Sequence, residues 1–151
     1  MEVADDIQPE LKPAAAVRLA AVQALFQIEQ SGDDVGKIAM QFIAHRLPEN
    51  ADADLFESLV KGTAAAMPVL DQQIGEALKS GWTVQRLDPT LRAILRCGLF
   101  ELSHRTHEPA RLLLDHYVDL AGSFFPDKET AFANAVLDRL ARDIRPGQLN
   151  A

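Results

Sequence analysis

Apolar residues recur every three or four positions along this chain, most clearly between residues 87 and 104. Asp88 is a favourable N-cap for a helix, and Pro89 suits the first helical position, where no backbone N–H is needed. Four leucines then follow at helical spacing: Leu91, Leu95, Leu99 and Leu102. A helix that is apolar around most of its circumference packs against several others. We therefore expect this helix at the centre of the molecule.

The other residues of this helix refine the prediction. Gly98 weakens a helix relative to alanine, which predicts that a neighbouring helix comes close there. Cys97 is the sole cysteine, which excludes an internal disulfide and a zinc site of paired cysteines. It lies on the apolar row, so we interpret it as a core residue. Arg92 and Arg96 either bind a ligand at a rim or pair with carboxylates such as Glu101. For Arg96, an ion pair is favoured.

The same periodicity predicts further helices, and no segment sustains the alternation typical of strands. The further helices span about residues 13–30, 35–47, 55–67, 69–81, 113–121 and 132–144. The chain is therefore predicted to be all-α, a compact bundle of about seven helices. We expect a single domain over residues 13–146, between a flexible acidic arm at residues 1–12 and a flexible tail at residues 147–151.

Composition narrows the class of protein. A chain of 151 residues can bury a sizeable core, and 48% hydrophobic with 25% charged residues is typical of a soluble domain. The formal net charge of −7 argues against a general nucleic-acid binder, because that role depends on neutralising phosphates. RNA binding would need a local basic patch or a basic partner. No apolar run is long enough for a membrane and no signal peptide is evident, so we expect a cytoplasmic protein.

Catalytic motifs are lacking in the sequence. The glycines are scattered singly rather than gathered in a phosphate-binding loop, and no nucleophile-elbow motif occurs. His104 and His107, with His116 further along, form a pattern of low specificity for metal. We predict no enzyme, no metal site and no cofactor.

Three segments, in this order and at this spacing, resemble the NusB family of transcription antitermination factors. They are residues 20–27 (AAVQALFQ), residues 82–102, and residues 132–138 (FANAVLD). The resemblance implies two small helical bundles in one domain. It also implies binding of boxA-type RNA jointly with NusE, a small-subunit ribosomal protein, in an antitermination complex with RNA polymerase during ribosomal RNA synthesis.

The resemblance also suggests site residues, although the chain departs from the family pattern at several positions. Family members often carry an arginine-rich start, where this chain has only Lys12 and Arg18, and Phe26 replaces a common tyrosine. Phe132 and Asn134 match the family. The candidate RNA contacts are Lys12, Arg18, Phe26, Arg86, Lys128, Phe132 and Asn134. The candidate partner contacts are Arg92, Glu101 and Arg105. The two arginines lie, with Arg86 and Arg111, in a region richer in cations than the rest, which could bind phosphate or an acidic partner surface. The alternative is that the phenylalanines are core residues and the cations are solvated or paired with local carboxylates.

Two other functions remain open from the sequence. A NusB-like domain also occurs fused to ribosomal RNA cytosine methyltransferases, although this chain has no glycine-rich cofactor motif. Some relatives form homodimers that bury the RNA face, which would make the chain a self-associating module.

Overall fold

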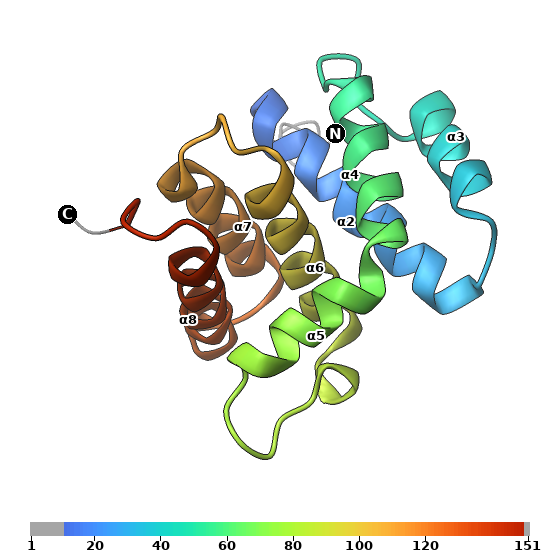
Figure 1. Ribbon diagram of the computed structural model, residues 1–151. Helices are drawn as coiled ribbons and strands as arrows, with labels where there is room; N and C mark the ends of the chain where they lie inside the picture. Colours follow the sequence, from blue (N-terminus) through green and yellow to red (C-terminus); the bar gives the residue numbers. More distant parts are fainter. Residues whose placement is uncertain (1–10, 150–151) are drawn as a thin grey trace, which may run out of the picture.

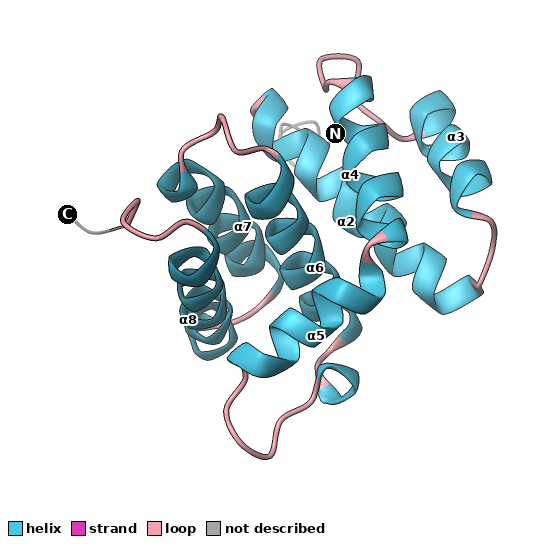
Figure 2. Ribbon diagram, viewed as in Figure 1, coloured by secondary structure: helices cyan, strands magenta, loops and turns pink. Residues whose placement is uncertain are grey.

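The computed structural model describes residues 11–149, and these residues fold into α-helices joined by short loops (Figures 1 and 2). The helices are α2 (Pro13–Ser31), α3 (Val35–His45), α4 (Ala53–Ala65), α5 (Met67–Ala77), the 3-10 helix η1 (Val84–Arg86), α6 (Pro89–His104), α7 (Ala110–Phe124) and α8 (Asp127–Ile144). The all-α prediction is confirmed. Residues 1–10 of the predicted arm and residues 150–151 of the predicted tail lie outside the described residues.

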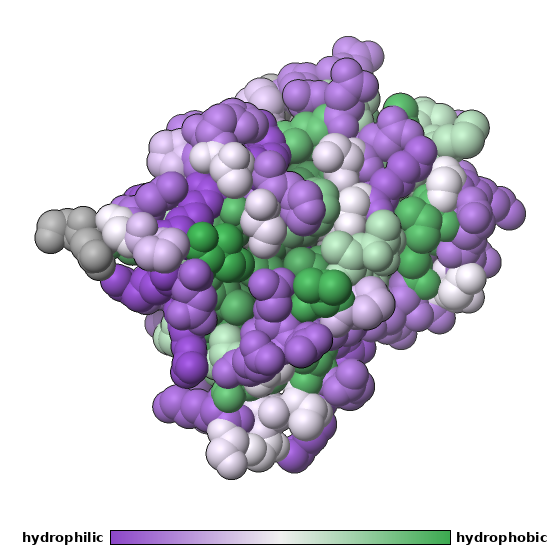
Figure 3. Space-filling view, viewed as in Figure 1, coloured by the Kyte–Doolittle hydropathy of each residue, from purple (hydrophilic) through white to green (hydrophobic). Residues whose placement is uncertain are grey.

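The helices form two groups that meet at α6 (Figure 1). Helices α2, α3 and α4 pack on one another, and α6, α7 and α8 form the second group, with α5 packed on α6 and α8. Helix α6 also packs on α2 and α4 and therefore joins the groups. On the face shown in Figure 3, hydrophilic residues predominate, with smaller apolar areas between them. None of the described helices has the length and apolar character needed to cross a membrane.

Helix α6 is the central helix that its sequence predicts. The Asp88 carboxylate accepts hydrogen bonds from the backbone N–H groups of Thr90 (2.8 Å) and Leu91 (3.3 Å), and Pro89 occupies the first turn. From Leu91 to Leu102, every residue except Arg92 is buried. The capped start and the continuous burial explain why such an apolar segment begins at a defined residue and stays inside the molecule.

The fourth predicted helix ends earlier than expected. We predicted that it runs to Gly81, but α5 ends at Ala77 and the chain becomes extended at Leu78. Gly81 has φ of 93°, a left-handed conformation that belongs to a turn. The chain turns there and then forms η1, which periodicity did not predict because three residues are too few to show it.

Two glycines mark close helix contacts. A Cβ atom built on Gly98 would lie 3.2 Å from side-chain atoms of both Leu137 and Tyr117, which confirms the predicted close approach. A Cβ on Gly62 of α4 would lie 2.1 Å from the Phe100 ring. Sequence reasoning missed this tighter contact, because Gly62 lies in an ordinary helical segment.

The contrast between Gly62 and Gly75 allows a test of this packing. Gly62→Ala should lower the free energy of unfolding by about 1–3 kcal/mol, because the new methyl group would displace a confined ring. Gly75→Ala, in α5 with nothing near the added Cβ, should raise that free energy by up to about 1 kcal/mol through helix propensity. Urea denaturation of both variants measures the difference, and similar effects of the two substitutions would contradict it.

Candidate nucleic-acid interface

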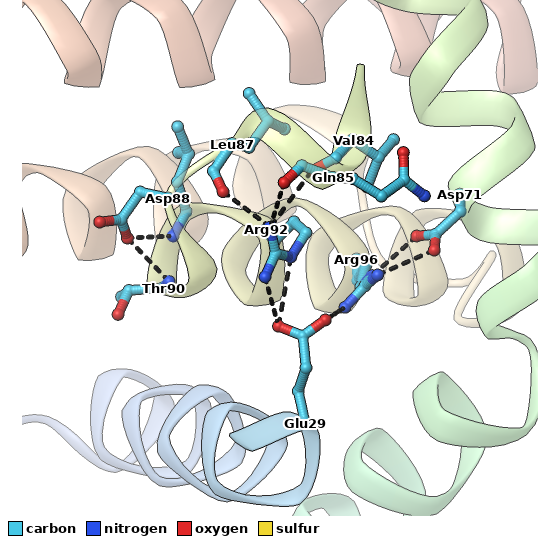
Figure 4. Close-up of polar contacts among 10 residues, drawn as sticks. Glu29, Asp71, Val84, Gln85, Leu87, Asp88, Thr90, Arg92 and Arg96 are labelled. Carbon is cyan, nitrogen blue, oxygen red and sulfur yellow. Dashed lines mark hydrogen bonds and ion pairs between the residues drawn. The ribbon is translucent and has the colours of Figure 1, made fainter.

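Two arginines of α6 connect it to three other elements (Figure 4). Arg96 donates hydrogen bonds to both carboxylate oxygens of Asp71 in α5, at 2.7 and 2.8 Å, and to Glu29 in α2 at 2.8 Å. Arg92 donates to Glu29 at 2.8 and 3.2 Å. Its remaining nitrogen donates to the carbonyl groups of Val84, Gln85 and Leu87, in and after η1. These bonds hold α2, α5 and η1 against α6.

The contacts decide between the two interpretations of these arginines. The predicted ion pair of Arg96 is confirmed, with Asp71 and Glu29 as partners rather than Glu101. The guanidinium of Arg92, predicted as a partner contact, is already engaged within the chain and positions η1. Partial burial acts to raise the pKa of Glu29, but the hydrogen bonds from Arg92 and Arg96 outweigh it and hold that pKa below its ordinary value.

Arg18 and Glu101 form an ion pair inside the core, which corrects two of the predicted contacts. The Arg18 Nε donates to Glu101 Oε1 at 2.9 Å, and the two residues are only 4% and 0% exposed. Tyr117 donates its hydroxyl hydrogen to the same carboxylate at 2.7 Å, and half-buried Arg105 donates to it at 2.8 Å. Arg18 is therefore not available to phosphates, and Glu101 is not a surface contact for a partner.

The buried carboxylate should make stability depend on pH. Burial acts to raise the pKa of Glu101, but hydrogen bonds and charge from Arg18 lower it below the ordinary value. A lowered folded-state pKa means that the stability contributed by the charge is present above the ordinary glutamate pKa, about 4.3. It is lost as pH falls through the lower folded-state pKa.

Glu101→Gln should therefore lower the free energy of unfolding at pH 7 by about 3–5 kcal/mol, because it leaves the Arg18 charge buried without a counter-charge. It should also flatten the loss of stability in acid. Urea denaturation between pH 7 and pH 3 measures both effects. The control is Glu57→Gln, which removes an exposed pair with Lys61 and should change stability by less than about 1 kcal/mol. The same acid slope in both variants would contradict the assignment.

A first pocket, of about 530 Å³, lies beside α2. Phe26 and Phe124 line it and are 37% and 42% exposed, so the predicted RNA contact at Phe26 is not sealed in the core. The other lining residues are Val22, Gln23, Gln27, Gln30, Ser31, Arg46 and Thr90. The pocket thus combines exposed aromatic rings with polar side chains.

A second pocket, of about 300 Å³, brings together three of the predicted RNA contacts: Arg86, Lys128 and Phe132. The Phe132 ring lies 6.2 Å from the ring of Trp82, and the Arg86 guanidinium lies 5.5 Å from the centre of the Trp82 ring. Sequence analysis did not select Trp82 as a contact. The sequence feature that could have identified Trp82 is its position as a large aromatic residue directly after Gly81 and outside any apolar row.

The two pockets flank the first turn of α6. Thr90 lines the first pocket, and Asp88 and Leu91 line the second. Four partly exposed rings therefore lie on either side of one helix start, and we call them the aromatic band: Phe26, Phe124, Trp82 and Phe132. Exposed rings offer faces on which unpaired bases can stack, so the arrangement suits single-stranded nucleic acid.

The remaining predicted contacts lie apart from the band. Lys12 precedes α2 and Asn134 lies on α8, and both are exposed but line neither pocket. Arg105 also lies outside both pockets, with its guanidinium bound to Glu101.

Comparisons with known proteins identify the family. The model of the NusB family matches residues 15–142. The chain belongs to the NusB family. It is 46% identical over 138 residues to the transcription antitermination protein NusB of Sinorhizobium fredii, a match that covers 86% of each chain. It is 41% identical to the NusB of Caulobacter vibrioides, covering 89% of this chain and 96% of that relative. Both relatives are named as transcription antitermination proteins, and neither is named as an enzyme.

Solved structures of NusB proteins share the fold. The NusB of T. maritima superposes with a TM-score of 0.78 at 26% identity, covering 91% of this chain and 96% of that chain. NusB in a complex of the antitermination factors NusB and NusE with double-stranded RNA gives a TM-score of 0.78 at 21% identity, covering 89% and 99%. The two-group helical architecture is therefore that of the NusB family.

Proposed function

We propose that this NusB-family protein binds boxA-type RNA along the aromatic band, jointly with NusE, within the antitermination complex of RNA polymerase that transcribes ribosomal RNA in the cytoplasm. The carrying observation is the placement of four partly exposed rings on both sides of the α6 start, with Arg86 and Lys128 beside two of them. Bases stack on the rings and the cations meet phosphates.

The charge of the chain supports a joint binding mode. The net charge is −7, and Arg46, Arg86 and Lys128 are the cations that line the two pockets. Phosphate neutralisation is the main source of affinity for nucleic acid, so three cations on an acidic protein give weak binding alone. A basic partner such as a ribosomal protein supplies the missing positive charge and is attracted by the acidic chain. A NusB structure with the same fold was solved with NusE and RNA.

Stacking on the band can be tested with Phe132→Ala. In the presence of NusE, this variant should bind a fluorescent boxA-type RNA with about 1–3 kcal/mol less free energy than the unchanged protein, because a stacking face is lost. Met40→Ala removes an exposed apolar side chain from α3, outside the band, and should bind as the unchanged protein does. Fluorescence anisotropy measures both affinities. No RNA binding by the unchanged protein, with or without NusE, would contradict the proposed function.

Phosphate contacts can be tested by salt dependence. The double variant Arg86→Ser and Lys128→Ser should lower the slope of log affinity against log salt concentration by about 0.7 for each cation, or about 1.4 together. Lys61→Ser changes an exposed lysine of α4 outside both pockets and should leave the slope unchanged. Equal slopes for all three proteins would show that the two cations do not meet phosphates.

A further inference from the structure

The first pocket carries a stripe of glutamine side chains. Gln23, Gln27 and Gln30 lie four and three residues apart on α2, which places them along one edge of the helix. All three line the pocket. Among residues 11–149, the side-chain amides of these three glutamines make no hydrogen bond with the protein. Each amide therefore offers two donors and an acceptor to a ligand.

Arg46 brings a cation to the same pocket. Its guanidinium carbon lies 4.4 Å from the centre of the Phe42 ring, a cation–π contact that leaves the N–H donors of the edge free. In the described part of the chain the Arg46 side chain pairs with no carboxylate. A guanidinium held in this way is available to a phosphate or to the acceptor groups of a base.

The walls of the pocket are complementary to a flat ligand. Phe26 and Phe124 supply apolar faces, while the glutamines supply hydrogen-bonding groups. A nucleobase has this division, with two apolar faces and an edge of donors and acceptors. A glutamine amide presents a donor beside an acceptor and pairs with two edge atoms of one base. A volume of about 530 Å³ is sufficient for one nucleotide.

We propose that the first pocket recognises the identity of one base, through the amides of Gln23, Gln27 and Gln30. The inference rests on the proposed binding of single-stranded RNA and assigns a different role to each of the two pockets. The second pocket combines rings and cations with the carboxylates of Asp88 and Glu129 and has no amide, so we assign it mainly base stacking and phosphate contact. Sequence discrimination then comes from α2 and affinity from both pockets.

The test uses the full chain with NusE and a panel of boxA-type RNAs that each differ at one position. The unchanged protein should prefer one base at one position by at least about fivefold, the scale of one net hydrogen bond. Gln27→Leu keeps the size of the side chain but removes its donor and acceptors. It should abolish that preference at that position alone, with the same salt dependence.

Gln30→Leu, at the exposed end of the stripe, provides a second variant. Gln41→Leu, an exposed glutamine of α3 outside the pocket, is the matched control and should retain the preference.

The outcomes separate this inference from the proposed function. RNA binding with an unchanged base preference in both Gln27→Leu and Gln30→Leu would overturn the inference and leave the function standing. Weaker binding of NusE with unchanged base preference would also overturn it, because the pocket would then be a protein contact. No RNA binding by the unchanged protein would remove the function itself, and the inference with it.

Discussion

The structure depends on pairing the charges that α6 carries into the core. Glu101 is fully buried and Arg96 nearly so, and each is matched by charged groups from other helices. A buried pair adds little net stability compared with apolar residues, but a buried charge without its partner costs several kcal/mol. The pairing therefore favours the observed placement of α2 and α5 against α6, because displacing either helix would leave a buried charge without its partner.

This requirement determines the geometry of the interface. Glu29 lies three residues after Phe26 on α2, so the bonds from Arg92 and Arg96 fix the helix end that carries the first pocket. Arg92 also binds the carbonyl groups of η1, the segment that contains Arg86. The bonds from Arg92 therefore hold the segments next to Phe26 and Trp82 against the same helix start.

Local sequence signals predicted those features that depend on neighbouring residues. The cap at Asp88, the buried row of α6, and the roles of Cys97 and Gly98 each follow from a short segment. The pairing of Arg18 with Glu101 could not be predicted, because 83 positions separate them in the sequence and no local pattern links one charged side chain to the other. A single charged residue in an apolar stripe gives no indication of whether it reaches solvent or a distant counter-charge.

The candidate site could be predicted only in part, because the sequence does not show which distant residues come together. Phe26, Lys128 and Phe132 came from family resemblance, and the structure places all three beside the α6 start. Trp82 and the glutamine stripe were missed, because their role in the site depends on the pockets that they line in the folded chain. Those relations exist only after the helices have packed.

Glu29 is a single carboxylate shared by both arginines of the α6 network. A chain that loses it loosens both sides of the interface in one step, and a compensating change at either arginine alone cannot restore them. The effect of substituting any one of these three residues therefore depends on the other two.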